Sequence, residues 1–209
     1  MTTDAPDTEE LLRRTGAGDP SARQQLLARH RDRLRRMVAV RLDPRLAPRV
    51  DPSDVVQEAL MVADRKLGAY LKERPVPFYP WLRRLAWEHL VKLHERHVLA
   101  RKRTVLREEP GILALPEDSA VLLAQRLAGD GSSPSHGLVR KEQRDRVRSA
   151  LARLSPADRE VLELRYLEQL STADIAGVLE IGEGAVKMRH RRALDRLSRL
   201  LTGEGGDQS

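Results

Sequence analysis

Residues 170–197 read LSTADIAGVLEIGEGAVKMRHRRALDRL, and this stretch decides the fold of the C-terminal part of the chain. Ser171 is a candidate N-cap, and Asp174 follows three residues later in a variant of the capping box. We expect a short helix over 172–179, a tight glycine-containing turn, and a second helix over 184–201. A short helix, a turn of about four residues and a further helix form the helix-turn-helix arrangement.

The second of these helices has two faces of opposite character. Residues 185–199 contain six Lys or Arg residues and one acidic residue, and at about 100° per residue the basic and apolar side chains separate. Such a helix can enter the major groove of DNA, where residues near its N-terminus reach base edges. A structural hairpin with a solvated basic face is the alternative, but the turn and the apolar pattern together favour DNA binding. The residues expected at base edges are Glu183, Lys187, Met188 and Arg191, and those expected at phosphates are Arg192, Arg196 and Arg199.

The composition indicates a helical protein with a polyanionic partner. The chain has 209 residues, 38 Lys+Arg against 31 Asp+Glu, a formal net charge of +7 and 3% aromatic residues. Good helix formers dominate and alternating Val/Ile runs are absent, so the fold class that we expect is all-α. Because there is no cysteine, disulfides and thiolate metal sites are excluded, and we expect no cofactor. No apolar run reaches the ~18 residues of a membrane span, and the polar N-terminus is not a signal peptide, so we expect a cytoplasmic protein without membrane contact.

Proline- and glycine-rich stretches divide the chain into two small helical domains. One of them contains EEPG, LPED and GDGSSPSHG, which are typical of a flexible linker, although SAVLLAQRL within it has the composition of a short helix that packs on a neighbouring domain. The predicted divisions are a frayed or disordered N-terminus at 1–18, with a short helix near Thr8–Arg14, a first domain at 19–103, a linker at 104–137, a helix-turn-helix domain at 138–201 and a disordered tail at 202–209. Helices are expected from Asp19 to about Leu42, from Asp51 to about Leu67, from Trp81 to about Arg101, and over 138–153 and 156–166.

Residues 51–60, DPSDVVQEAL, are an acidic stretch in this basic chain. Asp51 fits an N-cap and Pro52 the first helical position, so capping explains Asp51 fully and Asp54 in part. Capping does not explain the rest of the outward face, which also contains Gln57, Glu58 and Met61. An acidic patch with an exposed apolar residue suits a basic protein partner better than nucleic acid, which it would repel.

Residues 78–97, FYPWLRRLAWEHLVKLHERH, combine aromatic and basic side chains. Projected on a helix that begins at Trp81, Trp87 lies outside the leucine arc, among arginines, and Phe78 and Tyr79 precede the helix in a proline-braced loop. Exposed rings interleaved with cations suit single-stranded DNA, because bases stack on the rings while cations follow the backbone. Packing of these rings against the linker or the first helix is the alternative.

Metal-dependent enzyme chemistry is the least favoured interpretation. The histidines of 78–97 do not share a face with a carboxylate in zinc-binding geometry. A nuclease that holds Mg²⁺ on Asp51, Asp54 and Glu58 would need a base or a nucleophile to converge on them, and none does. We therefore expect no enzyme activity, no catalytic residue and no metal.

Three segments in this order resemble those of bacterial sigma-70-type RNA polymerase sigma factors, specifically the extracytoplasmic-function (ECF) group. They are VDPSDVVQEALMVADRKL (50–67), FYPWLRRLAWEHLVKLHERH (78–97) and LSPADREVLELRYLEQLSTADIAGVLEIGEGAVKMRHRRAL (154–194). The resemblance covers most of residues 20–103 and 138–201. No single motif is decisive, but three in the family's order are, and a linker of this length is too short for the extra domain of larger sigma factors.

This resemblance implies a role for each segment. In the family a D-x-x-D-[LV]-x-Q-E pattern docks on the coiled coil of the polymerase β′ subunit. Here that pattern falls on Asp51, Asp54, Gln57 and Glu58. The aromatic-basic helix of the family reads and melts the −10 promoter element. The matching positions are Phe78, Tyr79, Trp81, Arg84 and Trp87, with Lys92 as a backbone contact. The helix-turn-helix resembles region 4, which reads the −35 element and meets the polymerase β flap, and an anti-sigma factor is left open as a further partner.

We therefore expect an RNA polymerase sigma factor that recruits core polymerase to promoters, reads both promoter elements and supports melting by binding alone. The alternative is a helix-turn-helix regulator that binds duplex DNA without recruiting polymerase. Such a regulator needs neither the acidic face at 51–58 nor the aromatic-basic helix, so these two features favour the sigma factor.

Overall fold

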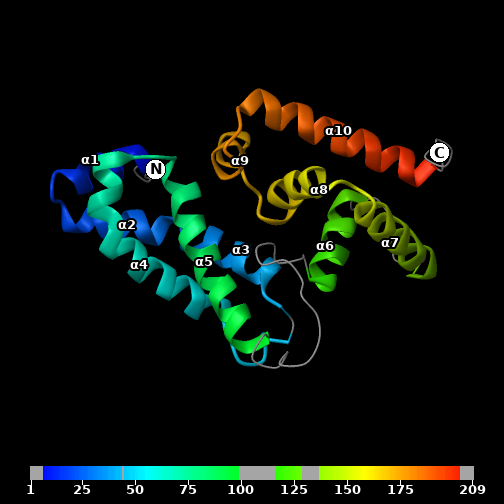
Figure 1. Cartoon of the computed structure of the whole chain (residues 1–209), viewed down its shortest axis with the longest axis horizontal. Helices are drawn as coiled ribbons and strands as arrows, with labels where there is room; N and C mark the ends of the chain where they lie inside the picture. The colour runs from blue at the N-terminus through cyan, green and yellow to red at the C-terminus, as the bar shows by residue number, and fades with distance from the viewer. Residues whose placement is uncertain (1–6, 44, 99–115, 129–136, 203–209) are drawn as a thin grey trace, which may run out of the picture. The chain divides into compact units, whose positions relative to one another are not determined.

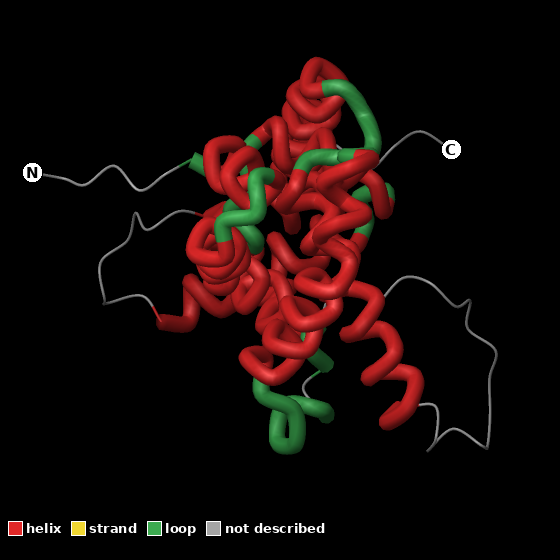
Figure 2. The backbone as a smooth tube through the Cα atoms, turned by 90° about the vertical axis from the view of Figure 1, so that its left-hand side faces the viewer, coloured by secondary structure: helices red, strands yellow, loops and turns green. Residues whose placement is uncertain are grey.

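The structure, a computed structural model, describes residues 7–43, 45–98, 116–128 and 137–202. Every regular element within these ranges is a helix, as the chain traces show (Figure 1, Figure 2). The chain divides into two units, Met1–Leu113 and Ala114–Ser209. The expected all-α class with two helical domains is confirmed.

The first unit is built from helices that follow one another through short turns. They are α1 (Thr8–Gly16), α2 (Pro20–Arg29), α3 (Arg31–Arg41), α4 (Pro52–Glu73) and α5 (Phe78–Val98). α4 and α5 pack along each other, α3 packs on both, and α1 packs mainly on α2. The largest fully buried side chains are leucines and a methionine of these helices, at Leu11, Leu12, Leu26, Leu34, Met37, Leu67, Leu82 and Leu90.

The N-terminal segment is more ordered than the sequence predicts. The short helix expected near Thr8–Arg14 is present as α1, and Leu11 and Leu12 are each 1% exposed in the core. The expectation of a frayed or disordered segment is therefore wrong over 7–18, because two adjacent leucines bury this helix. Residues 1–6 lie outside the described residues.

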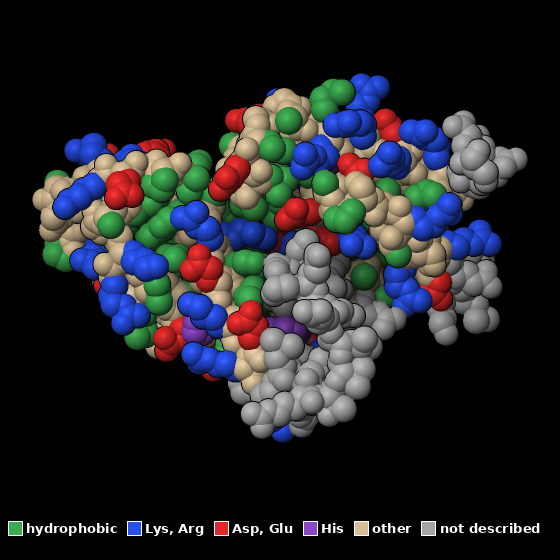
Figure 3. Space-filling view, in the orientation of Figure 1, with side chains coloured by type: hydrophobic (Ala, Val, Ile, Leu, Met, Phe, Trp, Pro, Cys, Tyr) green, Lys and Arg blue, Asp and Glu red, His purple; other side chains and the backbone are tan. Residues whose placement is uncertain are grey.

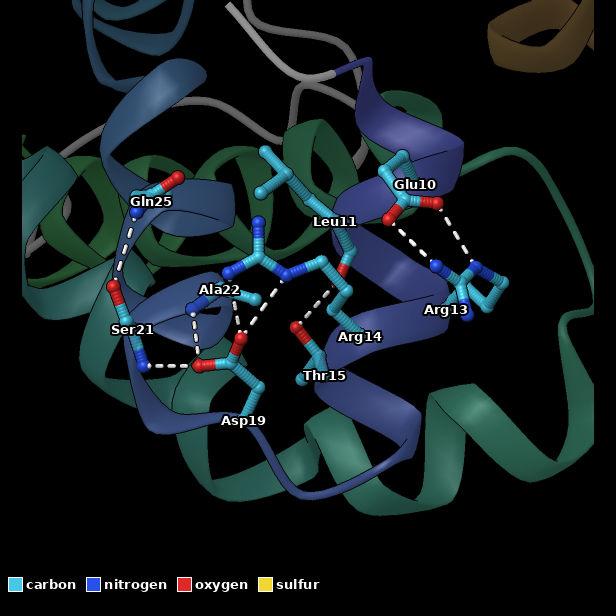
Figure 4. Close-up of polar contacts among 9 residues, drawn as sticks. All are labelled: Glu10, Leu11, Arg13, Arg14, Thr15, Asp19, Ser21, Ala22 and Gln25. Atoms are coloured by element: carbon cyan, nitrogen blue, oxygen red, sulfur yellow. Dashed lines mark hydrogen bonds and ion pairs between the residues drawn. The ribbon is translucent and has the colours of Figure 1, made fainter.

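Asp19 holds the corner between α1 and α2 (Figure 4). As predicted, it caps α2, accepting hydrogen bonds from the backbone N–H groups of Ser21 at 2.9 Å and Ala22 at 3.1 Å. The guanidinium of Arg14 donates to the other carboxylate oxygen at 2.7 Å. The backbone N–H of Ala22 and then the Arg14 side chain lower the pKa of Asp19, so the cap stays ionised at neutral pH.

Two helix boundaries in this unit differ from the prediction. The helix expected from Asp19 to Leu42 is interrupted at His30, whose 4% exposed ring lies 5.3 Å from the ring of Phe78. The interruption lets the imidazole pack on the start of α5. α4 continues past Leu67 to Glu73, where Arg74 ends it in the left-handed conformation at φ 40°.

The second unit contains the expected helix-turn-helix. Its elements are α6 (Glu117–Ala128), α7 (Gly137–Ala152), α8 (Pro156–Leu162), the π-helical segment η2 (Glu163–Leu167), α9 (Thr172–Leu179) and α10 (Glu183–Thr202). α10 packs on α7, α8 and α9, and these helices hold its inner face. The predicted cap is confirmed, because the Ser171 hydroxyl accepts a hydrogen bond from the backbone N–H of Asp174 at 3.1 Å.

The segment predicted as linker contains a helix that belongs to this second unit. α6 packs on α7 and η2, and Leu123 and Ala124 are 0% exposed. The prediction of a linker is therefore wrong for 117–128, and the alternative that this helix packs on a neighbouring domain is the correct one. The other linker positions, 104–115 and 129–136, and the tail at 203–209 lie outside the described residues.

Candidate protein-binding and nucleic-acid interfaces

The first turns of α4 carry an exposed acidic face. Asp51 caps the helix by accepting a hydrogen bond from the Ser53 backbone N–H at 2.6 Å, and this bond holds the pKa of Asp51 below its ordinary value. The buried side of the helix consists of Val55, Val56, Ala59, Leu60, Ala63 and Leu67, as the sequence predicts. On the outward side Asp54, Gln57 and Glu58 are exposed, and Met61 is 47% exposed beside them. This face presents carboxylates around an apolar side chain, which is the chemistry that a basic protein surface complements.

His89 of α5 lies close enough to Glu58 for the two side chains to interact electrostatically. Burial lowers the pKa of His89 from 6.5, and the Glu58 charge opposes this shift. At neutral pH the imidazole is uncharged, so it does not offset the negative charge of the acidic face.

The exposure predicted for the aromatic residues at the start of α5 is wrong. α5 begins at Phe78, not at Trp81, because Pro80 falls in the first turn, where no backbone N–H is needed. Phe78, Tyr79 and Trp81 are therefore on the helix, at 2%, 3% and 6% exposure. Their rings form a cluster with Tyr70, whose ring centroid is 4.5 Å from that of Trp81. Their burial is the packing alternative that the sequence leaves open. The Phe78 and Tyr79 rings contact His30, within the first expected helix, and the Phe78 and Trp81 rings contact Tyr70 of α4.

Trp87 and the residues around it remain accessible. Trp87 is half-buried, and the guanidinium carbons of Arg41 and Arg83 lie 5.4 and 6.0 Å from the centre of its ring. Both arginines are nearly buried, at 7% and 8% exposure. Arg84 and Lys92 are exposed, as expected. A π face with two fixed cations and flexible ones nearby can hold a base and its phosphates.

Sequence reasoning missed the two arginines beneath Trp87. Arg83 could have been found, because it lies four residues before Trp87 on one helix and such pairs share a face. Projection instead placed it outside the core. Arg41 comes from α3, and no local pattern indicates that contact.

The basic face of α10 is exposed, and Lys and Arg side chains gather over this helix in the space-filling view (Figure 3). Val186, Ala193 and Leu197 are buried against the other helices. Met188 is 55% exposed, and the Arg191 side chain is 80% exposed. The other exposed polar positions on this face are Glu183, Lys187, Arg192 and Arg199. The predicted separation of the two faces is therefore confirmed.

Arg196 differs from the other arginines of α10. Its Nη1 lies 3.0 Å from Oδ2 of Asp158, an α8 residue that is 8% exposed. No local sequence pattern predicts this pair, because the partners are 38 residues apart along the chain. Arg196 thus ties α10 to α8, in addition to any contact with phosphate.

The turn before α10 depends on a residue that the sequence analysis did not identify. The two glycines of EIGEG were the expected turn formers, but Glu180 takes the left-handed conformation, at φ 53°. The backbone N–H of Ile181 then donates to the Ala176 carbonyl at 3.0 Å, which closes the end of α9. This geometry fixes the angle at which the chain enters the recognition helix.

A groove of about 600 Å³ lies between α7 and the C-terminal end of α10. Arg146 and Arg153 line it together with Leu201, which is 41% exposed. Asp145 also lines the groove, so charges of both signs lie beside apolar side chains, and the groove is a second candidate site for binding a protein segment.

The described part of the chain shows no group of three or more His, Cys, Asp or Glu side chains that could hold a metal ion. Among the described helices none is both long and apolar enough to cross a membrane.

Comparison with known proteins places the chain in a family. The family model for sigma-70, region 4, matches residues 144–197. The RNA polymerase sigma factor CnrH of Cupriavidus metallidurans is 31% identical over 198 residues, which cover 93% of this chain and 94% of that protein. The ECF RNA polymerase sigma factor SigM of Mycobacterium tuberculosis is 30% identical over 192 residues, which cover 92% of this chain and 83% of that protein. The solved structure of CnrH in complex with the cytosolic domain of CnrY matches with a TM-score of 0.51 at 24% identity, covering 95% of this chain and 100% of that one, and supports the fold.

Two helical units, one of which carries a helix-turn-helix with a basic outer face, define a DNA-binding protein of the transcription machinery. The chain belongs to the sigma-70 family of RNA polymerase sigma factors, in the ECF group. Its function is that of a sigma factor in transcription initiation, and the simple regulator considered from the sequence is set aside.

Proposed function

We propose that three surfaces of this sigma factor divide the work of initiation. The start of α4 docks on the β′ coiled coil of core RNA polymerase, α5 holds the melted −10 strand, and α10 reads the −35 element as duplex DNA. The protein acts by binding alone and does so in the cytoplasm, where core polymerase is found.

The acidic face of α4 is the observation that carries the proposal. Asp51, Asp54, Gln57 and Glu58 match the family pattern and occupy the first turns of one rigid helix whose other side is fully buried. Exposed carboxylates repel promoter DNA, so this face suits a protein rather than the nucleic acid. Met61, at 47% exposure, supplies apolar area that such an interface would bury.

We propose that the melted −10 strand contacts Trp87 and its neighbours, and not the buried rings at the start of α5. Phe78, Tyr79 and Trp81 could stack on a base only if the start of α5 opened, because almost none of their surface is accessible. We therefore assign them to holding α5 in place. The proposed strand contacts are Trp87 with Arg41 and Arg83, and Arg84 and Lys92 along the backbone.

For the −35 element the proposed base-reading residues are the exposed ones in the first turns of α10. These are Glu183, Lys187, Met188 and Arg191. Arg192 and Arg199 are the proposed phosphate contacts, while Arg196 serves in part to anchor the helix through Asp158. The groove between α7 and α10 is the proposed seat of the β flap.

A protein that covers these surfaces would silence the sigma factor. CnrH was solved in complex with the cytosolic domain of CnrY. We include an anti-sigma factor among the proposed partners, with the acidic face of α4 as a surface for which it would compete with polymerase.

The test is binding to core polymerase, followed by run-off transcription from promoter fragments of the source genome. In a Gln57→Ala, Glu58→Lys double variant we expect core binding to weaken by about 2 kcal/mol or more, because an interfacial charge is reversed. Glu73→Lys is the matched control, since it makes the same charge change at the far end of α4 and should bind as the wild type does. Wild-type affinity in the double variant would refute the docking surface.

A further inference from the structure

Tyr166 of η2 contacts two helices from different parts of the second unit. Its backbone carbonyl accepts a hydrogen bond from Nη1 of Arg126, on α6. Its ring stacks on that of His190, on α10, with centroids 5.8 Å apart and planes 27° apart. The hydroxyl lies 3.3 Å from Nε2 of His190.

The backbone around Tyr166 is fixed on both sides. The flanking residues Leu164 and Leu167 are 0% and 1% exposed, so η2 cannot shift without disturbing the core. Arg165 donates from Nη1 to the carbonyl of Leu170 at 3.0 Å, which ties η2 to the turn before α9. Carbonyl groups in the last turn of a helix have no backbone N–H donor further along the helix. The Arg126 guanidinium supplies a donor to the carbonyl of Tyr166. π-helical segments of this kind occur frequently at functional sites.

His190 sits on α10 beside the side chains proposed to read bases. It is half-buried, while Lys187 and Arg191, on the same stretch of helix, are exposed. The far half of α10 is pinned independently, by the pair between Arg196 and Asp158. The contact with Tyr166 is therefore made on the half of α10 that carries Lys187 and Arg191, where Val186 is also buried.

α6 is the first described element that follows the first unit along the chain, and it reaches Tyr166 directly. We propose that Tyr166 is a positioning residue through which α6 sets the orientation of the recognition helix, so that α6 tunes how sharply the −35 element is discriminated. This inference rests on the proposed reading of duplex DNA by α10.

The experiment compares full-length variants for binding to two DNA duplexes by fluorescence anisotropy. One duplex is selected by the wild-type chain from a random pool, and the other is a scrambled version of it. In Arg126→Ala we expect the preference for the selected duplex to fall about 3- to 10-fold, while affinity for the scrambled duplex changes little. Arg148→Ala, which removes a partly exposed arginine of α7 from the same unit that does not line the groove between α7 and α10, should keep the wild-type preference.

A double-mutant cycle separates coupling through Tyr166 from the loss of a positive charge. Tyr166→Leu keeps the backbone carbonyl but removes the ring and the hydroxyl that contact His190, so in that background Arg126→Ala should cause no further loss of preference. Additive losses in the cycle, or a wild-type preference in Arg126→Ala, would overturn the inference.

A second readout does not depend on DNA. In an NMR titration of the full chain, Arg126→Ala should move the titration midpoint of His190, and this movement should vanish in the Tyr166→Leu background. A wild type that prefers no duplex would refute the proposed −35 reading, while this titration still decides whether α6 acts on His190. An unchanged midpoint in Arg126→Ala would refute the coupling itself.

Discussion

Arginine residues of α10 have different roles, although they look alike in the sequence. Arg196 pairs at 3.0 Å with Asp158, which is nearly buried, while Arg191 reaches Asp195 only at 3.9 Å and its side chain is 80% exposed. An exposed pair of this kind contributes little to stability, so Arg191 is available for DNA. The local partner of each arginine, rather than its charge, decides its role.

This difference predicts the effect of removing Arg191. Arg191→Ala should weaken binding to a cognate −35 duplex by about 1–3 kcal/mol, with a much smaller loss on a scrambled duplex, because a base contact carries sequence information. Arg199→Ala, further along the same helix, should weaken both duplexes equally. Equal losses on the two duplexes for Arg191→Ala would identify it as a phosphate contact instead.

The protonation of His190 predicts how the second unit responds to pH. Burial, and then the charge of Arg165, lower the pKa of His190 from 6.5. Below pH 6.5 the unfolded chain therefore binds a proton that the folded unit does not, so the stability of this unit should fall as the pH drops from 6.5 towards the folded pKa. Urea unfolding, followed by NMR signals of α10 at pH 7.5 and 5.5, measures the change.

His190→Gln is the control for that measurement, since it removes the titrating group and should make the stability of α10 depend less on pH. The pKa of His89, in the first unit, is lowered as well, so only NMR signals from the second unit report on His190. A pH dependence that persists unchanged in His190→Gln would assign the effect to other groups.

At the scale of single elements, the turn between α9 and α10 contains a strained backbone conformation that lowers the stability of the fold. Glu180 has φ 53°, a conformation that a non-glycine residue adopts at a cost and glycine adopts freely. Glu180→Gly should therefore raise the free energy of unfolding by about 0.5–1 kcal/mol. Ala173→Gly, at an exposed helical position of α9, should lower it by up to about 1 kcal/mol. Chemical denaturation of both variants tests the pair, and destabilisation by Glu180→Gly would show that its side chain matters more than its backbone.

The same elements show which features the sequence could predict. The starts of α2, α4 and α9 were predicted correctly, because each cap is a contact between residues two or three positions apart. The outward face of α4 and the two faces of α10 followed from helical periodicity alone. Helix caps and helix faces depend on residues that are close together in the sequence, so they can be predicted from it.

Features that depend on tertiary packing could not be predicted in the same way. Phe78 and Tyr79 were expected to be exposed among cations, but they are buried with Trp81, and their rings contact Tyr70 and His30 from other segments. The pairs Arg196–Asp158 and His190–Tyr166 likewise join residues that no short pattern connects. The proposed strand-binding site on α5 therefore centres on Trp87 and not on these buried rings.

For the whole molecule, the boundary between the two units is the main change from the sequence prediction. The composition of 104–137 indicated a linker, but α6 within it places Leu123 and Ala124 in the core of the second unit. Because α6 packs on α7 and η2, it adds buried apolar surface to a small domain. In a domain of this size each buried side chain contributes noticeably to the free energy of unfolding. The functional second unit therefore begins before α6 and not at residue 138.

This boundary predicts the behaviour of two fragments. A fragment of residues 114–209 should be more stable to urea than one of residues 138–209, because the shorter one exposes the surfaces of α7 and η2 that α6 covers. In the full chain, Leu123→Ala should lower the stability of the second unit by about 2–4 kcal/mol, since it removes a fully buried side chain. Gln125→Ala, at an exposed position of α6, should have almost no effect. Equal stability of the two fragments, together with a silent Leu123→Ala, would show that α6 is a passive part of the linker and would return the boundary to residue 138.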